Sequence, residues 1–347
     1  MKPSFDVINP TKYPSWDELL LHDNKCTIFH TSAWAKVLSE TYGYEPAYFT
    51  LIEGRKISAL IPVMDVRSIL TGRRGVSLPF SDYSNSFLAP GMQLKDAMNM
   101  VLPFGKQHGW KFFEWRDAND LCFDVEPSFC FYGHTVHLSP DEKKLFSSFR
   151  DSTKRNVQKA IQANVKVEIS QSFESVKEYY RLHCLTRKWY GLPPQPFYFF
   201  RKIHEHILSR KMGFIVLASH ERKNIASAVY FHFGEAALYK YGASDRTYQH
   251  LRANNLVMWE AIKWYAQNGF KSFSFGRTEM NNPGLLQYKS GWGPRERMIK
   301  YYRYDLQKEL FVRQASSQTS GRFNKILRKV PIPCLALIGT LSYRHIG

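Results

Sequence analysis

The sequence predicts an α+β fold made of two similar halves, each with helices interleaved among mostly antiparallel strands. The chain has 347 residues, of which 44% are hydrophobic, and this is enough for two ordinary domain cores. Patterns typical of helices and of strands alternate along its whole length. Two segments of the first half, 51–63 and 106–116, also resemble segments 219–231 and 266–277 of the second half, in the same order.

Caps and turns mark the elements of the first half. We predict a helix between Thr31 or Ser32 and Gly43, because hydroxyl side chains favour helix N-termini and glycine favours the turn after a helix. A hairpin is predicted around the turn at 53–54. Beyond it the sequence predicts a loop at 78–91, a helix at 95–108, and strands at 111–116 and 133–138.

The second half repeats this order with additional helices. Helices are predicted at 147–165, 176–191, 197–209 and 249–268, and strands at 213–219, 224–233, 237–244, 271–277 and 299–305. Each half therefore runs helix, hairpin, helix, strand. We predict a first domain at 1–140, a second domain at 141–310 and a basic amphipathic C-terminal tail at 311–347.

Composition limits the location and the partners. The formal net charge of +18 favours a polyanionic ligand or surface, although it also serves solubility. The five cysteines form no CxxC pair, and neither a metal site nor a disulfide framework is indicated. The N-terminal residues have charges and prolines where a signal peptide would need an apolar run, and no segment is apolar for long enough to span a membrane. We therefore expect a cytoplasmic protein.

Six segments together resemble the FemAB-like branch of the GNAT acyltransferase superfamily. They are 29–49, 78–90, 154–168, 186–196, 273–294 and 337–347. This family includes aminoacyltransferases that form peptidoglycan bridges, BioF2-like acetyltransferases and members found with exopolysaccharide genes. The resemblance implies two tandem GNAT-like domains related by internal duplication, and an acyltransferase that acts on a cell-envelope precursor.

The resemblance also implies a donor site near the end of the second half. In the Fem family an aromatic-Lys pair lies at the acceptor end of the aminoacyl-tRNA, which assigns Tyr288 and Lys289 to the donor site. Lys289 is the candidate catalytic residue there, because an ammonium stabilises charge that develops on a carbonyl oxygen. Arg277 is either a clamp on phosphate or carboxylate or a member of a structural salt bridge.

Four further residues are candidates for substrate binding. Arg155 and Lys159 lie four residues apart on one helix face, where they either bind a phosphate backbone or form a solvated face. Asn255 falls within an apolar stripe, where its amide needs a partner. That partner is either a neighbouring backbone segment or a substrate beside Arg252.

The loop at 78–91 offers polar residues for the acceptor. Ser81, Asp82 and Tyr83 are candidates to contact the acceptor amine, and Asp82 is the candidate to take the proton that acyl transfer releases. The alternative is an Asx-turn that only holds the loop in shape.

The donor is predicted to be aminoacyl-tRNA, with no cofactor held tightly. Relatives that use acetyl-CoA carry a glycine-bearing loop whose amides hold pyrophosphate, but residues 244–256 contain no glycine. Two alternatives remain. One is transfer from acyl-CoA to an amino sugar or similar amine, and the other is a non-catalytic basic protein that binds RNA or a membrane.

The tail is predicted either to contact a membrane or to fold back onto a domain. Its apolar run, Ile332 to Leu341, is too short to cross a bilayer. Basic residues flank the run: Arg322, Lys325, Arg328, Lys329 and Arg344. Charge combined with an apolar face is typical of reversible attachment to an anionic membrane surface.

Overall fold

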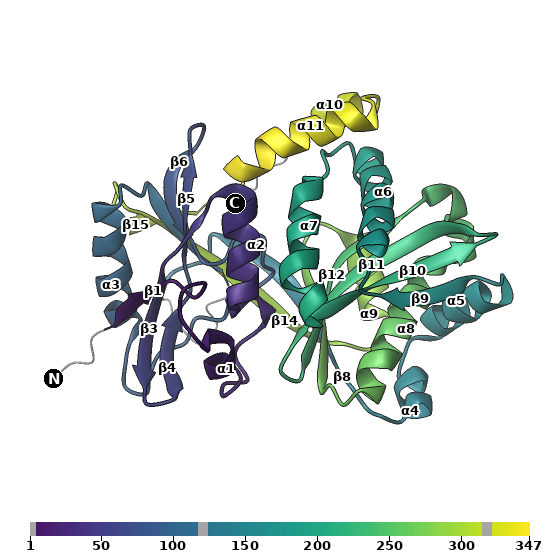
Figure 1. Cartoon of the computed structure of the whole chain (residues 1–347), viewed down its shortest axis with the longest axis horizontal. Coiled ribbons are helices and arrows are strands. Elements are labelled where there is room, and N and C mark those ends of the chain that lie inside the picture. Colours follow the sequence, from purple (N-terminus) through teal and green to yellow (C-terminus); the bar gives the residue numbers. More distant parts are fainter. Residues whose placement is uncertain (1–4, 117–123, 314–320) are drawn as a thin grey trace. The chain divides into compact units, whose positions relative to one another are not determined.

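The computed structural model describes residues 5–116, 124–313 and 321–347 as a mixed α+β fold of two compact units (Figure 1). Unit 1 comprises Met1–Phe131, Met298–Ser317 and Ser342–Gly347, and unit 2 comprises Tyr132–Arg297 and Gln318–Leu341. The predicted fold class is confirmed. The units differ from the predicted domains because the chain returns to unit 1 at Met298, and residues 301–305 pair there with a strand of the first half.

Unit 1 contains two sheets. Its helices are α1 (Trp16–Leu20), the short η1 (Ile28–His30), α2 (Ser32–Tyr42), α3 (Leu94–Gln107) and the short η4 (Tyr343–His345). Its strands are β1 (Asp6–Ile8), β2 (Glu45–Pro46), β3 (Tyr48–Glu53), β4 (Lys56–Ile61), β5 (Met64–Ser68), β6 (Gly72–Val76), β7 (Phe112–Arg116), most of β14 (Arg295–Asp305) and β15 (Leu310–Phe311). One sheet has the order β1-β3-β4, and the other includes β2-β5-β6-β7-β14.

The core of unit 1 lies between these sheets and α3. Phe49 from β3, Phe113 from β7 and Tyr302 from β14 pack together with Val101 from α3. Trp110 joins them directly before β7. Because β14 supplies part of this core, the first half of the sequence does not complete its hydrophobic interior alone.

Unit 2 is built on one mixed sheet of the order β8-β13-β12-β11-β10-β9. Its strands are most of β8 (Phe129–His137), then β9 (Lys166–Ser170), β10 (Gly213–His220), β11 (Lys223–Phe233), β12 (Ala236–Ser244) and β13 (Ser272–Glu279). Its helices are α4 (Glu142–Ser147), α5 (Asp151–Gln162), α6 (Phe173–Tyr190), α7 (Phe197–His206), the short η2 (Leu208–Arg210) and η3 (Arg246–Leu251), α8 (Ala253–Gln267), α9 (Pro283–Ser290), α10 (Gly321–Leu327) and most of α11 (Ile332–Ser342). Helices α6 and α7 cover one face of the sheet, and α8 with α5 covers the other (Figure 1).

Both units contain a strand-helix-strand segment with parallel strands. In unit 1, β6 and β7 are parallel and are joined through α3, and in unit 2, β12 and β13 are parallel and are joined through α8. Each helix is followed by a glycine with a positive φ angle, 69° at Gly109 and 82° at Gly269. These glycines are the ones that the internal repeat aligns, because only glycine adopts this turn without strain.

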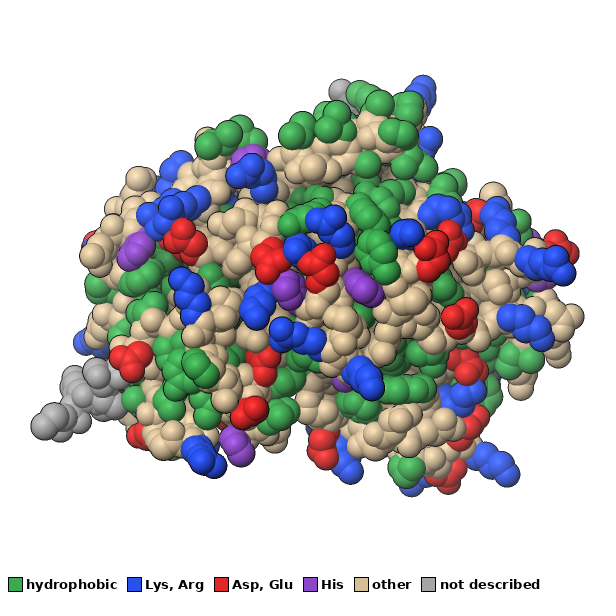
Figure 2. Space-filling model, in the orientation of Figure 1, with side chains coloured by type: hydrophobic (Ala, Val, Ile, Leu, Met, Phe, Trp, Pro, Cys, Tyr) green, Lys and Arg blue, Asp and Glu red, His purple; other side chains and the backbone are tan. Residues whose placement is uncertain are grey.

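The C-terminal helices α10 and α11 pack on unit 2 with one face. Leu335 of α11 is 1% exposed, and the Cα of Gly339 lies so close to the chain that an added Cβ would fall 1.9 Å from the Pro194 carbonyl oxygen. Their outer side keeps hydrophobic side chains exposed (Figure 2). Of the tail, residues 314–320 and the side chain of Arg322 lie outside the described residues.

Among the helices of the described ranges, none combines the length and the apolar character that crossing a membrane requires.

Candidate functional site

A small cavity of about 130 Å³ opens at the N-terminus of α8 in unit 2. It is lined by Ile225, Ala226, Ser244, Asp245, Tyr248, Gln249, Arg252, Ala253, Asn254, Asn255 and Tyr288. The N-cap residue Arg252 has a φ of 59° and its side chain makes no cap hydrogen bond to the helix. The first amide groups of α8 therefore carry the partial positive charge of the helix end without a side-chain cap.

Three predicted binding residues meet at this cavity. Asn255 lines it although only 7% of the residue is exposed, and none of the described residues hydrogen-bonds its side-chain amide. The Tyr288 hydroxyl donates a hydrogen bond to the Asn254 carbonyl at 3.1 Å, and burial raises its pKa well above the ordinary value. Arg252 is exposed at the rim. The cavity thus offers a guanidinium, an amide and a protonated phenol to an oxygen-rich ligand.

Lys289, the residue after Tyr288, does not line the cavity. Helix α9 begins at Pro283 behind the Asn282 cap, whose side chain accepts a hydrogen bond from the Leu285 amide. Neighbouring helical residues point in different directions, so Lys289 is 2% exposed while Tyr288 faces the cavity. The Lys289 ammonium donates to the Arg277 carbonyl oxygen at 3.0 Å, which fixes the end of β13.

Arg155 and Lys159 lie on the exposed face of α5, and neither lines the cavity at α8. The buried residues Val157 and Ala160 occupy the opposite face of this helix. The two basic side chains are therefore available to an external polyanion but are not part of the cavity.

His134 of β8 is a buried polar residue that is absent from the predicted site residues. It is 1% exposed, and its Nε2 atom lies 3.2 Å from the Glu296 Oε2 atom. Burial and the nearby Lys289 charge lower its pKa, and Glu296 opposes them. The alternation of the predicted strand at 133–138 was the available signal, because it places His134 on the same face as the buried Val136.

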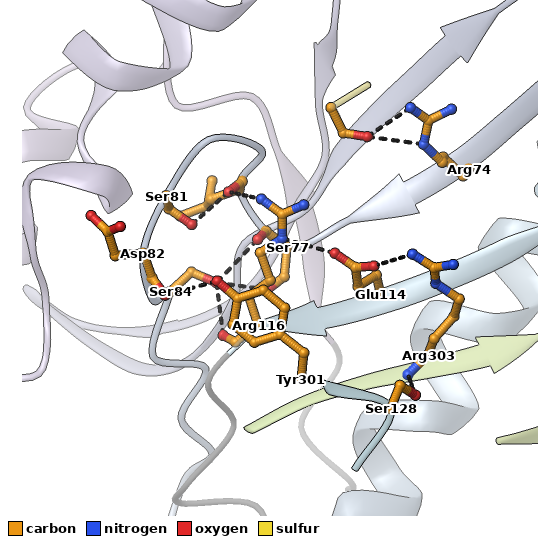
Figure 3. A network of polar contacts seen from close by, with 12 residues as sticks. Arg74, Ser77, Ser81, Asp82, Ser84, Glu114, Arg116, Ser128, Tyr301 and Arg303 are labelled. Carbon is orange, nitrogen blue, oxygen red and sulfur yellow. Dashed lines mark hydrogen bonds and ion pairs between the residues drawn. The ribbon is translucent and has the colours of Figure 1, made fainter. Parts of the chain in front are cut away.

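A second polar cluster lies in unit 1 and is centred on the buried Glu114 of β7 (Figure 3). Arg116 donates from Nε to one carboxylate oxygen at 2.9 Å, and Arg303 donates from Nη2 to the other. Burial alone would raise the pKa of Glu114, but the two guanidinium groups outweigh it and lower the pKa to about 2. Glu114 is therefore ionised and holds both arginines in place.

Arg116 connects this cluster to the predicted acceptor loop. Its carbonyl oxygen accepts hydrogen bonds from the Ser84 amide at 3.3 Å and the Ser84 hydroxyl at 3.1 Å (Figure 3). The loop contains two non-glycine residues with positive φ, Leu78 at 51° and Phe80 at 60°. Such backbone angles are costly and persist only where the surroundings hold them.

The three predicted acceptor residues lie at the turn of this loop. Ser81 is 2% exposed, and its hydroxyl donates to the Leu78 carbonyl at 2.6 Å. The Asp82 carbonyl accepts a hydrogen bond from the Tyr301 hydroxyl at 2.8 Å, while its carboxylate points away from the Glu114 cluster (Figure 3). Tyr83 is half-buried and packs edge-on against Phe29. Within this cluster, Ser81 stabilises the loop and Asp82 presents a carboxylate from it.

The acetyltransferase (GNAT) domain family matches residues 147–290, which include the cavity at α8. Residues 147–290 therefore form a GNAT domain. Within this domain, the segment between β12 and α8 contains no glycine, and Arg252 adopts the left-handed backbone angle at the N-cap of α8. No protein of curated function matches the sequence.

Solved structures extend the similarity of fold to nearly the whole chain. FemX is similar with a TM-score of 0.61 and 13% identity over 85% of this chain and 96% of FemX. A Bacteroides thetaiotaomicron protein of unknown function has a TM-score of 0.58 and 8% identity over 86% of this chain and 98% of its own. The C-terminal domain of a protein described as a lysylphosphatidylglycerol synthetase from Agrobacterium fabrum has a TM-score of 0.52 and 12% identity over 89% and 92%. The predicted FemAB-like fold of tandem GNAT-like domains is confirmed.

Proposed function

We propose that this acyltransferase transfers an aminoacyl group from aminoacyl-tRNA to an amine of a peptidoglycan, exopolysaccharide or other cell-envelope precursor. The observation that carries the proposal is the cavity at the N-terminus of α8, where the buried Asn255 lies in the lining with Arg252 and Tyr288. The enzyme works in the cytoplasm, at the inner face of the membrane, where lipid-linked precursors are accessible.

The size of the cavity supports a donor that enters with only one end. Pockets for whole small ligands are usually about 300–1,000 Å³, whereas this cavity has about 130 Å³. A terminal ribose with its aminoacyl ester requires little enclosed space, and the rest of a tRNA stays outside. The charge of +18, with Arg155 and Lys159 exposed on α5, suits an RNA backbone.

The loop of unit 1 is the proposed acceptor site. Acyl transfer forms a bond between the acceptor nitrogen and the acyl carbon and breaks the bond to the ribose oxygen. The acceptor ammonium first gives one proton to Asp82, the proposed base, and the resulting amine attacks the acyl carbon. The second proton of the amine passes to the departing ribose oxygen, which leaves as a hydroxyl. Ser81 supports the loop, and Tyr83 forms its side. Lys289 is a positioning residue that acts through the Arg277 main chain.

Acyl-CoA is the second candidate donor, and the uncapped N-terminus of α8 favours it. Backbone amides at a helix N-terminus bind phosphate groups well, even where the preceding turn has no glycine. In this case the acceptor is an amino sugar or a similar amine. Membership of the acyltransferase family supports both enzymatic candidates over a non-catalytic protein that only binds RNA or a membrane.

Binding measurements with both donors test the proposal. Wild-type protein should bind aminoacyl-tRNA more tightly than acetyl-CoA, with filter binding and calorimetry as the respective measurements. Arg252→Ala and Asn255→Leu should each weaken donor binding about tenfold, because each removes one polar contact to the ligand.

Arg155→Ala is the matched control for the cavity, since Arg155 is exposed and does not line it. It should weaken tRNA binding only slightly and leave acetyl-CoA binding unchanged. If acetyl-CoA binds more tightly than aminoacyl-tRNA, acyl-CoA and not aminoacyl-tRNA is the donor. Binding of neither donor would refute the proposed function.

A further inference from the structure

An apolar surface runs along the outer side of α10 and α11. Phe323 and Ile326 of α10 and Leu337 and Leu341 of α11 are each more than half exposed, and Ile338 is 40% exposed. Figure 2 shows hydrophobic side chains gathered along these helices, with basic side chains beside them at one end. Contiguous exposed apolar side chains of this kind mark an interaction surface.

The opposite face of the pair is packed tightly, so the apolar surface has a fixed orientation on unit 2. Gly339 lies against the Pro194 carbonyl, and Gly191 lies against α10, where an added Cβ would fall 2.0 Å from the Asn324 carbonyl oxygen. Leu327 and Leu335 are buried beneath the helices. The exposed apolar side chains therefore lie on the outer face of the two helices, which does not take part in this packing.

Two aromatic side chains extend this surface at the end of α6. Trp189 and Tyr190 directly precede Gly191 and are 48% and 55% exposed. The Arg246 guanidinium lies over the Trp189 ring, 4.0 Å from its centroid. Tryptophan and tyrosine favour the boundary between water and lipid, because an apolar ring there carries a polar tip.

A groove at the end of α10 and the residues that lead to α11 adds positive charge to the apolar surface. Its volume is about 430 Å³, and it is lined by Lys325, Ile326, Lys329, Val330 and Pro331. Lys325 of α10 and Lys329 of the turn after it both line this groove, so it carries two positive charges. Two lysines above an apolar floor match the phosphate and the first methylene groups of an anionic phospholipid.

We propose that this surface, formed by α10, α11 and the Trp189-Tyr190 end of α6, binds the headgroup region of an anionic membrane. The helices lie in the plane of the interface, with the apolar side chains among the acyl chains and the two lysines on lipid phosphates. Membrane binding would bring the enzyme to lipid-linked acceptors, so the purpose of this surface rests on the proposed function. Its test needs neither donor nor acceptor.

Vesicle flotation with the full chain tests the surface. Wild-type protein should float with vesicles of phosphatidylcholine and phosphatidylglycerol and much less with phosphatidylcholine alone. Lys325→Glu/Lys329→Glu and Leu337→Ser/Leu341→Ser should each reduce the bound fraction roughly tenfold or more, since each basic side chain at an anionic surface contributes about 1 kcal/mol and apolar burial adds to it. Thermal unfolding checks that both variants are folded.

Matched controls lie elsewhere on the protein. Ile69→Ser/Leu70→Ser removes two exposed apolar side chains of unit 1, and Lys143→Glu/Lys166→Glu reverses two exposed lysines of unit 2. Both controls should float like wild type. Equal flotation of all variants, or equal flotation with neutral vesicles, would overturn the proposal.

Three further outcomes separate the membrane proposal from the proposed function and from nucleic-acid binding. If Lys325→Glu/Lys329→Glu weakens tRNA binding but not flotation, the lysines serve a nucleic acid and the membrane proposal is refuted. If flotation fails while donor binding persists, the surface is refuted and the acyltransferase proposal stands. If donor binding fails while flotation persists, the acyltransferase proposal is refuted and the membrane surface stands.

Discussion

At the scale of one residue, Glu114 shows how unit 1 stabilises a buried charge. A carboxylate that loses its water is costly unless it is paired, and here Arg116 and Arg303 bond both of its oxygens. The Arg303 guanidinium also lies over the Phe112 ring, 4.3 Å from its centroid. The sequence indicates a strand at 111–116, but it gives no sign that Glu114 faces inward to meet an arginine from β14.

Glu114→Gln should destabilise unit 1 by about 3–5 kcal/mol, because it leaves two largely buried guanidinium groups without their counter-charge. Urea unfolding followed by tryptophan fluorescence measures this change. Glu309→Gln is the control, since Glu309 is an exposed partner of Lys106, and it should leave the unfolding midpoint unchanged. A loss as small as that of the control would mean that the Glu114 cluster is not stabilising.

At the scale of elements, local signals located most helices and strands. Helix α2 begins after Thr31, whose hydroxyl accepts from the Trp34 amide, and ends at Gly43 with a φ of 73°, as its caps predict. Two predicted helices differ in their bounds from the observed ones. The helix predicted at 147–165 is observed as α5, which begins only at Asp151, and the preceding helix α4 was not predicted. The helix predicted at 249–268 begins instead within η3, and α8 follows. The hairpin of β5 and β6 lacked a periodic signal and was missed.

The C-terminal helices supply the prediction at this scale. Gly191→Ala and Gly339→Ala should each destabilise the packing of α10 and α11 by about 1–3 kcal/mol, because the new Cβ would collide with a main-chain carbonyl. Limited proteolysis should then cleave these helices faster than in wild type. Gly284→Ala, whose Cβ would meet nothing within 4 Å, should behave like wild type. Equal cleavage of all four proteins would show that the two close approaches are readily relieved.

At the scale of the whole molecule, buried histidines couple stability to pH. His30 is fully buried, its Nδ1 accepts from the Thr27 amide at 3.0 Å, and its Nε2 therefore donates to the Asn85 carbonyl. Burial lowers the pKa of His30 to about 4 and that of His183 to about 3. Both residues are neutral in the folded protein at physiological pH.

The free energy of unfolding should therefore fall as the pH drops below 6.5. The unfolded chain takes up protons near the ordinary histidine pKa of 6.5, whereas the folded protein takes up a proton at His30 only near pH 4. His30 alone should account for about 3 kcal/mol, lost between pH 6.5 and 4. Urea unfolding at several pH values measures this slope. His30→Gln should flatten the slope, and an unaltered slope would show that His30 does not titrate as described.

The net charge of +18 is the second property of the whole molecule that can be tested. The affinity for aminoacyl-tRNA should fall on the order of a hundredfold or more between about 50 and 200 mM salt, because binding releases counterions from the RNA. Filter binding across this range measures the effect. An affinity that is independent of salt would exclude the RNA backbone as the main source of binding energy.

Caps, turns and hydrophobic periodicity act over a few residues, so they were enough to predict the α+β class, the internal repeat and most element positions. They could not predict that β14 completes unit 1, that Tyr288 reaches the cavity while Lys289 is buried, or that Arg155 and Lys159 stay outside it. These outcomes depend on packing between residues far apart in the chain, where burial and the directions of neighbouring side chains are set jointly by several elements.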